Sequence, residues 1–258
     1  MGTSLCYLRG LGVSVVNPFP SLKTTLAHDF YEAVETRRTV RDFLPDPVPQ
    51  EVLDRALDAA RLAASSSNLQ PWEFVIIQSP EARRQANAIC LDQLPAKTAP
   101  LLLAIVTHRE TWRRNRDEIL RVFEARGGVR KSMASYYRRI IPLVYTNGPF
   151  GILGPLKRAF GRVASLFKPT PNLMSRADVR VMAHKSTALA AATFMLAMRA
   201  EGYDTCPMEG FDPWRAKALL DLPHGAEVCM FLAVGKRSDK GVWWDRVLMP
   251  KEWVVREI

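Results

Sequence analysis

The chain reads ETRRTVRDF at residues 35–43, which places three guanidiniums and one threonine hydroxyl within five positions. Apolar side chains at helical spacing precede this cluster, so it is expected where a first helix, over residues 29–37, ends. A guanidinium presents a rigid fork of donors that matches phosphate oxygens, and a neighbouring hydroxyl adds a neutral donor. Two interpretations remain open for this stretch: a site for a phosphate monoester, or a solvated basic helix end that complements the helix dipole.

Thirty residues later the chain reads ASSSNLQPW at positions 64–72. This run of hydroxyl and amide side chains follows a predicted helix over residues 49–63, whose apolar positions have core spacing. Hydroxyls and amides at a helix exit can bind a polyol or the edge of a heteroaromatic ring, because each supplies a donor or an acceptor. An ordinary Ser/Asn turn is the alternative interpretation.

The remaining pattern alternates helices with short strands. Ser175 and Asp178 form a predicted capping pair for the longest helix, which is rich in alanine and stops at Gly202. Small residues on several of its faces would let other helices approach closely, as expected of a central or inter-subunit helix. The expected strands are 73–78, 100–106 and 227–234; the other expected helices begin near 79, 110, 156 and 212; residues 203–206 are expected to be extended and 207–210 to form a turn.

The net charge of +10 is concentrated in one segment. Residues 108–168 hold fourteen Lys and Arg against four Asp and Glu, and the rest of the chain is balanced. Within this segment, residues 156–167 have apolar side chains at helical spacing with basic residues opposite. Such a helix can lie on a membrane surface, but packing on its own domain is the favoured interpretation. A basic segment also allows nucleic-acid binding, but no recognition module accompanies it, so no nucleic acid is expected as a partner.

Several classes of protein are disfavoured by the sequence. The four cysteines are far apart and outside any metal-binding spacing, so we expect reduced thiols, no metal site and a cytoplasmic location. No apolar run approaches the length of a membrane span, and neither a Gly-x-Gly-x-x-Gly loop nor a Walker motif occurs. The two ends of the chain lie outside this pattern of helices and strands. Residues 1–26 lack a clear period and are expected to form an irregular N-terminal arm. The apolar C-terminal tail, with Trp243, Trp244 and Trp253, is expected to dock on something.

In order and spacing, residues 37–43, 65–72 and 207–212 resemble three motifs of the flavin-dependent nitroreductase family. The resemblance covers residues 29–103 and 177–258, and leaves out the arm and most of a basic insertion at about 108–175. It implies an α+β fold with a mostly antiparallel central sheet wrapped by helices. It also implies an intertwined homodimer, one domain over residues 27–258, and FMN at two interfacial sites.

The resemblance assigns roles residue by residue. Arg37, Arg38 and Thr39 would hold the FMN phosphate and ribityl chain, and Arg41 would approach the pyrimidine edge of the flavin. Ser65, Ser66, Ser67 and Asn68 would reach the FMN bound mainly by the partner subunit. Gln70, Pro71 and Trp72 would shape that wall of the cofactor site. Pro207, Met208, Glu209 and Gly210 would lie along the ring, with a backbone N–H near N5. Arg246 would add a phosphate contact, whereas Leu248 replaces a basic residue of the family pattern and could leave the phosphate clamp thinner.

The resemblance also implies the reaction. FMN would take a hydride from NAD(P)H onto N5 and pass it to a small, aromatic acceptor such as a nitroaromatic or a quinone, in a ping-pong scheme. No protein side chain is expected to act as a catalytic acid or nucleophile. The insertion would form a lid whose Trp112, Tyr136 and Tyr137 either stack on the substrate or, as aromatic residues more often do, pack in the core. The alternative is a nucleic-acid or membrane-surface binding protein that retains a non-catalytic flavin-family fold.

Overall fold

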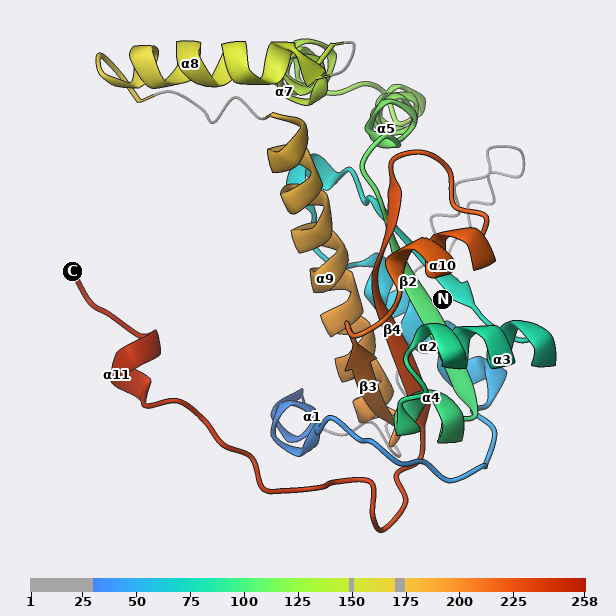
Figure 1. Cartoon of the computed structure of the whole chain (residues 1–258). Coiled ribbons are helices and arrows are strands. Elements are labelled where there is room, and N and C mark those ends of the chain that lie inside the picture. Colours follow the sequence, from blue (N-terminus) through green and yellow to red (C-terminus); the bar gives the residue numbers. More distant parts are fainter. Residues whose placement is uncertain (1–29, 149–150, 170–174) are drawn as a thin grey trace, which may run out of the picture.

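The computed structural model describes residues 30–148, 151–169 and 175–258. Its centre is a four-stranded antiparallel sheet with the order β1-β2-β4-β3 (Figure 1). The strands are β1 (Trp72–Ile76), β2 (Leu101–His108), β3 (Asp204–Met208) and β4 (Ala226–Gly235). The expected α+β class with an antiparallel sheet is therefore confirmed. The predicted arm at residues 1–26 and the helix start at Asp29 lie outside the described residues.

The core lies on both faces of the central strands. Leu102 and Ala104 face one side, where they pack against α3 (Pro80–Ile89), α4 (Leu94–Thr98) and α10 (Pro213–Leu219). Leu103 and Ile105 face the other side, against α2 (Gln50–Arg61) and α9 (Arg176–Ala200). This division follows from the two-residue period of a strand, and it explains why β2 is apolar at nearly every position.

The helix α9 runs along one face of the sheet. Ser175 accepts a hydrogen bond from the backbone N–H of Asp178, and the Asp178 carboxylate accepts one from the backbone N–H of Ser175, so the predicted capping pair is present. Among the described helices, α9 is long and apolar enough to cross a membrane by length and composition. Its buried side chains, Phe194 among them, pack on the sheet and on α2, which accounts for that apolar character as part of a core.

A second group of helices lies over the N-terminal end of α9 (Figure 1). We call it the lid segment; it comprises α5 (Trp112–Ala125), α6 (Lys131–Ser135), the π-helix η2 (Tyr136–Ile140), α7 (Ile141–Tyr145) and α8 (Leu153–Ser165). Two basic side chains of α8 hold the segment together. Lys157 donates to three carbonyl oxygens at the end of α7, at 2.8–3.1 Å, and Arg158 pairs with Asp178 at the start of α9.

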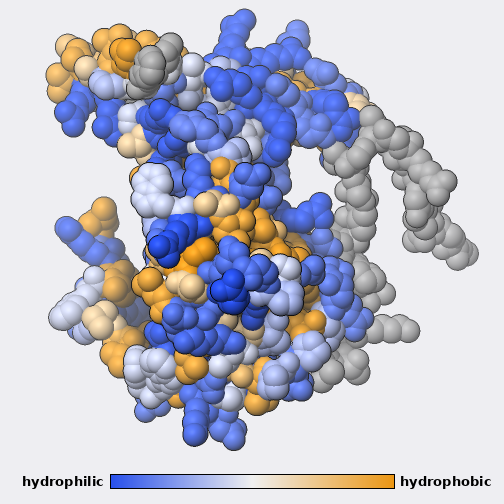
Figure 2. Space-filling model, turned by 45° about the vertical axis from the view of Figure 1, so that its right-hand side comes forward, coloured by the Kyte–Doolittle hydropathy of each residue, from blue (hydrophilic) through white to orange (hydrophobic). Residues whose placement is uncertain are grey.

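The apolar side of α8 is exposed in the described chain. Leu156 and Phe160 are each 67% exposed and Phe167 just beyond the helix is 83% exposed, and orange side chains gather over α8 at the upper left of Figure 2. The expectation that this face packs on its own domain is therefore wrong for a single chain. Local sequence predicted the amphipathic helix but not the surface it would meet.

The C-terminal tail is likewise uncovered. After β4 the chain extends away from the sheet to the short helix α11 (Lys251–Val254), and Trp244 and Trp253 are 66% and 73% exposed. In Figure 1 the tail and α8 project to the same side of α9, one beyond each end of that helix. Among the described residues the expected docking is made only in part: Trp243 and Trp244 lie against Arg41, whereas Trp253 on α11 stays exposed. The elements not yet given are α1 (Phe30–Thr36) and the short 3₁₀ helix η1 (Ser66–Asn68).

Candidate cofactor site

The basic stretch at residues 37–43 crosses the outer edge of β3. Thr39 forms a parallel bridge with Thr205, and the backbone N–H of Val40 donates to the Thr205 carbonyl oxygen at 3.2 Å. Two residues on, the N–H of Arg41 donates to the carbonyl oxygen of Gly241 at 2.7 Å. Because neighbouring side chains of an extended chain point to opposite sides, Val40 is buried in the core while Thr39 and Arg41 face outward.

An acidic residue that sequence reasoning missed anchors this crossing. Asp204 is 2% exposed, and its two carboxylate oxygens each accept a hydrogen bond from Arg237 at 2.6 Å. Arg199 reaches the same carboxylate at 3.2 Å and also donates to the Thr36 hydroxyl at 2.9 Å. The cluster therefore ties the end of α1 to α9, β3 and the loop after β4. It joins residues from 36 to 237, which local patterns do not connect.

The predicted phosphate-binding residues share one cavity of about 330 Å³. It is lined by Arg37, Arg38, Thr39 and Arg41 together with residues 242–247 of the tail, including Arg246. Arg38 donates to the carbonyl oxygen of Trp244, and Arg246 donates to that of Arg37. Burial, and after it the neighbouring charge of Arg246, lowers the pKa of Arg37, while Asp204 opposes this. We call this cavity the arginine pocket.

Tail residues complete the arginine pocket in a way the sequence did not indicate. The Arg41 guanidinium lies over the ring of Trp243 at 4.9 Å and over that of Trp244 at 6.0 Å. Leu248 is 77% exposed and is not part of the lining, so the position that departs from the family pattern makes no wall here. The lining contains no residue of the lid segment. It is formed by residues 37–41 of the basic stretch and residues 242–247 of the tail.

The second predicted stretch forms a tight loop with unusual backbone geometry. Ser67, Asn68 and Gln70 have φ values of +55°, +53° and +44°. Side chains other than glycine rarely adopt this region, and such residues concentrate at ligand-binding sites, where surrounding contacts hold them. Here Ser65 accepts a hydrogen bond from the Gln70 N–H, and Ser186 of α9 accepts one from the N–H of Ser66.

The lid segment holds the outer side of this loop. The hydroxyls of Ser67 and Tyr136 lie 2.7 Å apart, the Tyr137 hydroxyl donates to the carbonyl oxygen of Ser67 at 3.0 Å, and Asn115 donates to that of Leu69 at 2.7 Å. Sequence reasoning missed Ser186 and Asn115, since single polar residues on amphipathic helices carry no motif.

The three aromatic candidates differ in exposure. Trp112 and Tyr137 are 4% and 6% exposed and belong to the core cluster of the lid segment, which favours packing over recognition. Tyr136 is 40% exposed beside the loop, and a substrate-facing role stays a prediction for it.

In the third predicted stretch, at residues 207–212, the strand continues further than expected and a turn can begin only after Met208. Pro207 and Met208 pair with Leu232 and Phe231 and therefore end β3 instead of forming a turn. The expectation of a turn over all of 207–210 is wrong at these two residues. β3 is an edge strand, and an edge tolerates proline because the missing N–H need not pair. Glu209 and Gly210 follow the strand, and the Gly210 carbonyl oxygen accepts a hydrogen bond from Gln93 at 2.7 Å.

One chain does not bring all three stretches to one place. The loop at 65–70 contacts α9 at Ser186, whereas the arginine pocket adjoins its other end near Arg199. Thirteen helical residues separate these contacts, which is about 20 Å at 1.5 Å per residue. The structure thus groups residues 37–41, Thr205 at the start of β3 and residues 242–247 at one end of α9, and the loop with the lid segment toward the other. Glu209 and Gly210 follow the opposite end of β3.

Known proteins share both the sequence pattern and the fold of this chain. A sequence model of the Nitroreductase family matches residues 34–236. Protein DrgA of Synechocystis is 30% identical over 212 residues, which is 82% of this chain and 85% of that protein. A protein of Staphylococcus epidermidis, provisionally named an NAD(P)H:FMN oxidoreductase, has a similar structure, with a TM-score of 0.73, 22% identity and coverage of 92% and 99%.

A second solved structure contains a ligand. It is a provisionally named nitroreductase of Exiguobacterium sibiricum in complex with FMN, with a TM-score of 0.66, 22% identity, and coverage of 91% of this chain and all of that one. At this level of identity, both structures bear on the fold alone.

Proposed function

The chain belongs to the nitroreductase family and is an NAD(P)H oxidoreductase of that type; we propose that its cofactor is FMN and that two copies form each site. The observation that carries the proposal is the arginine pocket, which unites Arg37, Arg38 and Thr39 with Arg246 from the far end of the chain. The chain of similar fold from Exiguobacterium sibiricum holds FMN, so the fold is compatible with this cofactor.

The chemistry of the arginine pocket fits a phosphate monoester. Burial chiefly, and after it the like charge of Arg246 and Arg38, lowers the pKa of Arg37. The nearby Asp204 carboxylate opposes this shift, but it is hydrogen-bonded to Arg237 and Arg199 and offsets the positive charge of the pocket only in part. A dianion bound between the three guanidiniums would relieve this repulsion and accept charge-assisted hydrogen bonds.

The proposed homodimer accounts for the surfaces left open in one chain. Exposed apolar side chains occur on α1, on α8 and along the tail, and α8 and the tail project to the same side of α9 (Figure 1). A second copy on that side would cover them, and its 65–70 loop would meet the first copy's arginine pocket from across the interface. Sedimentation or light scattering measures the mass: a monomer at micromolar concentration would contradict this part of the proposal.

When bound, FMN would accept a hydride from NAD(P)H at N5 and pass it to a small aromatic acceptor. The residues of this chain would bind and orient it. Arg41 would supply positive charge near the flavin ring, the backbone at Glu209 and Gly210 would border it, and Tyr136 would offer an exposed ring to an aromatic acceptor. A nitroaromatic or a quinone fits this description. An NAD(P)H oxidation assay with both acceptors tests it, and turnover of neither would count against the aromatic class.

The cofactor proposal is tested by removing one guanidinium. R38Q should weaken FMN binding about 10–100-fold, because a hydrogen bond to a charged group contributes roughly 1.5–3 kcal/mol. R84Q is the matched control, since Arg84 is an exposed arginine of α3 that pairs with Glu81. Fluorescence quenching of FMN during titration gives both affinities. Equal FMN affinity in R38Q and R84Q, or no FMN binding by the unaltered protein, would overturn the assignment.

We also propose a cytoplasmic location, in keeping with the free thiols of the three cysteines among the described residues. Cys90 and Cys206 are buried as free thiols, and Cys229 is partly buried. Cell fractionation tests this, and recovery from an extracytoplasmic fraction would contradict it.

A further inference from the structure

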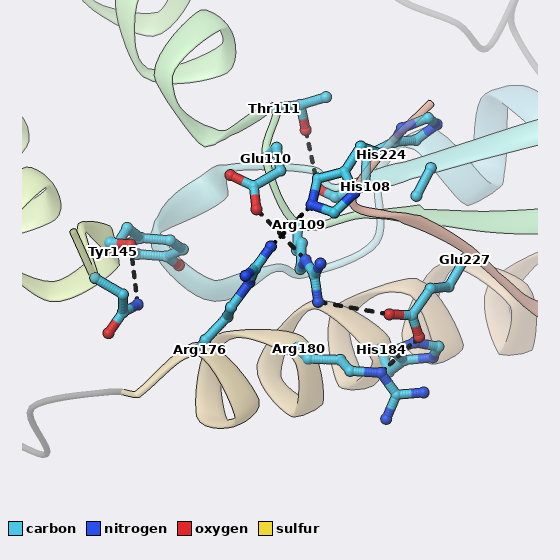
Figure 3. A network of polar contacts seen from close by, with 12 residues as sticks. His108, Arg109, Glu110, Thr111, Tyr145, Arg176, Arg180, His184, His224 and Glu227 are labelled. Atoms are coloured by element: carbon cyan, nitrogen blue, oxygen red, sulfur yellow. Dashed lines mark hydrogen bonds and ion pairs between the residues drawn. The ribbon is translucent and has the colours of Figure 1, made fainter. Parts of the chain in front are cut away.

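A second basic cavity lies at the N-terminal end of α9, apart from the arginine pocket. It has a volume of about 420 Å³, and Arg109, Arg113, Arg176 and His224 line it together with one carboxylate, Glu110. These residues come from the end of β2, from α5, from α9 and from the loop before β4. Figure 3 shows Arg176 rising from α9 toward Arg109 and Glu110.

Local backbone geometry brings these elements together. Gly225 has φ +88°, and a Cβ at this position would lie 2.4 Å from Cγ of Glu110. The Arg109 N–H donates to the Gly225 carbonyl oxygen at 3.3 Å. Only glycine allows this close approach together with this conformation, and the neighbouring His224 is part of the cavity lining. Arg176 is held at the start of α9 by the capping pair that precedes and follows it.

The positive charge in this cavity is incompletely balanced. Arg109 lies 3.4 Å from Glu110 and 3.7 Å from Glu227, and its buried Nε has no hydrogen-bond partner among the described residues. Glu227 is shared, since it also pairs with Arg180 at 2.5 Å and with His184 at 3.3 Å (Figure 3).

The remaining two guanidiniums contact neutral groups. Arg176 donates to Nε2 of His224 at 2.9 Å, which requires the imidazole to accept as a neutral ring. Arg113 lies over the ring of Trp112 at 4.4 Å. Neither contact supplies a negative charge, and the positive end of the α9 dipole adds to the surplus.

From this arrangement we propose that the cavity binds a phosphoryl group, either as free phosphate or as part of a small phosphate monoester. Guanidiniums that approach from three separate elements suit a tetrahedral group with three terminal oxygens better than a planar carboxylate. The site is distinct from the proposed FMN phosphate site. In the register of β4, Ala226 lies beside His108 and Val234 beside Thr205, so the two cavities are about 26 Å apart along the sheet at 3.3 Å per residue.

Isothermal titration calorimetry with inorganic phosphate and with phenyl phosphate tests this proposal without depending on bound flavin. R176Q and R113Q remove a guanidinium from the cavity at exposed positions. R162Q removes one from the polar side of α8, outside the cavity, and matches the change in charge. R38Q alters only the arginine pocket. Circular dichroism and thermal melting establish that each variant is folded.

The expected result is saturable binding of phosphate at a site that R162Q and R38Q leave unaltered and that R176Q and R113Q weaken at least about tenfold. In flavin-free protein the arginine pocket is expected to add a second phosphate site, which R38Q weakens and the cavity variants do not. Tighter binding of phenyl phosphate than of phosphate would identify a monoester as the ligand, and equal binding would identify the free ion. The proposal is overturned if phosphate does not saturate any site at millimolar concentration or if both cavity variants bind as the control does. It is also overturned if R38Q alone abolishes binding, which would move phosphate to the arginine pocket.

Discussion

The Asp204 cluster offers the sharpest test of how the arginine pocket is held. Replacing Asp204 with asparagine keeps the shape of the side chain but removes its charge. In the structure that carboxylate is 2% exposed, whereas its partners Arg199 and Arg237 are 16% and 35% exposed. The change leaves two guanidiniums at a partly buried position without a counter-ion, and it removes the charge that opposes the lowered pKa of Arg37.

The expected loss can be estimated from the burial of the cluster. Breaking a buried ion pair by removing one partner costs about 3–5 kcal/mol. Asparagine can still accept one hydrogen bond, and Arg237 is partly solvated, so we expect the lower end, about 3 kcal/mol. For a chain of this size that corresponds to a melting temperature lower by about 6–12 °C. D58N is the control, because Asp58 forms an exposed pair with Arg61, and such pairs contribute about 0–1 kcal/mol.

Urea unfolding followed by circular dichroism gives both free energies. The double variant D204N/R237Q adds a second check, because removing the uncompensated guanidinium should recover part of the loss, with a coupling of about 0.5–3 kcal/mol. If D204N loses no more than D58N, or if the double variant shows no coupling, the cluster does not hold this end of the molecule.

Three further changes test other parts of the structure. The pKa of Asp178 is lowered to about 2, chiefly by Arg158, so its contribution to stability is present above the ordinary pKa of about 4 and is lost as pH falls through 2. D178N should therefore destabilise by about 1 kcal/mol at pH 6 and by much less at pH 2, where the carboxyl is about half protonated, as urea titrations at both values would measure. Y136F removes the contact to the Ser67 hydroxyl and should speed hydrogen exchange in the 65–70 loop about fivefold or more, while unchanged mass-spectrometric exchange would count against it. In G241A, the added Cβ would lie 2.6 Å from the backbone oxygen of Asp42. We expect weaker FMN binding in titrations and a free energy of unfolding lower by about 1–3 kcal/mol. Unaltered values would show that the tail shifts to accommodate the methyl group without cost.

Local signals in the sequence sufficed for the framework of the fold. The unbroken apolar run at 100–106 predicted a strand buried on both faces, and β2 has that environment. Ser175 and Asp178 predicted the start of α9, because a capping box depends on residues three apart. Pro207 predicted a turn because proline is found in strands only at a sheet edge, and the edge position of β3 is set by the strand order across the whole chain.

The parts that sequence did not predict depend on contacts between distant segments. No local pattern distinguishes Asp204 from other acidic residues, because its partners Arg199 and Arg237 come from other segments of the fold. The apolar stripe on α8 predicted an amphipathic helix. Whether that stripe packs on the same chain or on another copy depends on the arrangement of the whole molecule, which the helical pattern does not contain. The apolar rings of Trp243 and Trp244 predicted that the tail would pack on another surface. Their position against the Arg41 guanidinium depends on how the tail folds back onto residues 37–41, which local sequence does not indicate.

The central claim is that each FMN is held by the arginine pocket of one copy and the 65–70 loop of the other. A mixed dimer tests it most directly: R38Q and N68A chains, each with its own affinity tag, are co-expressed and the heterodimer is titrated with FMN. Both homodimers should have two equally weakened sites. In the heterodimer both changes should fall on one site, so that the other binds FMN with unaltered affinity and the titration shows two classes of site. A single uniform class of weakened sites in the heterodimer would contradict the account.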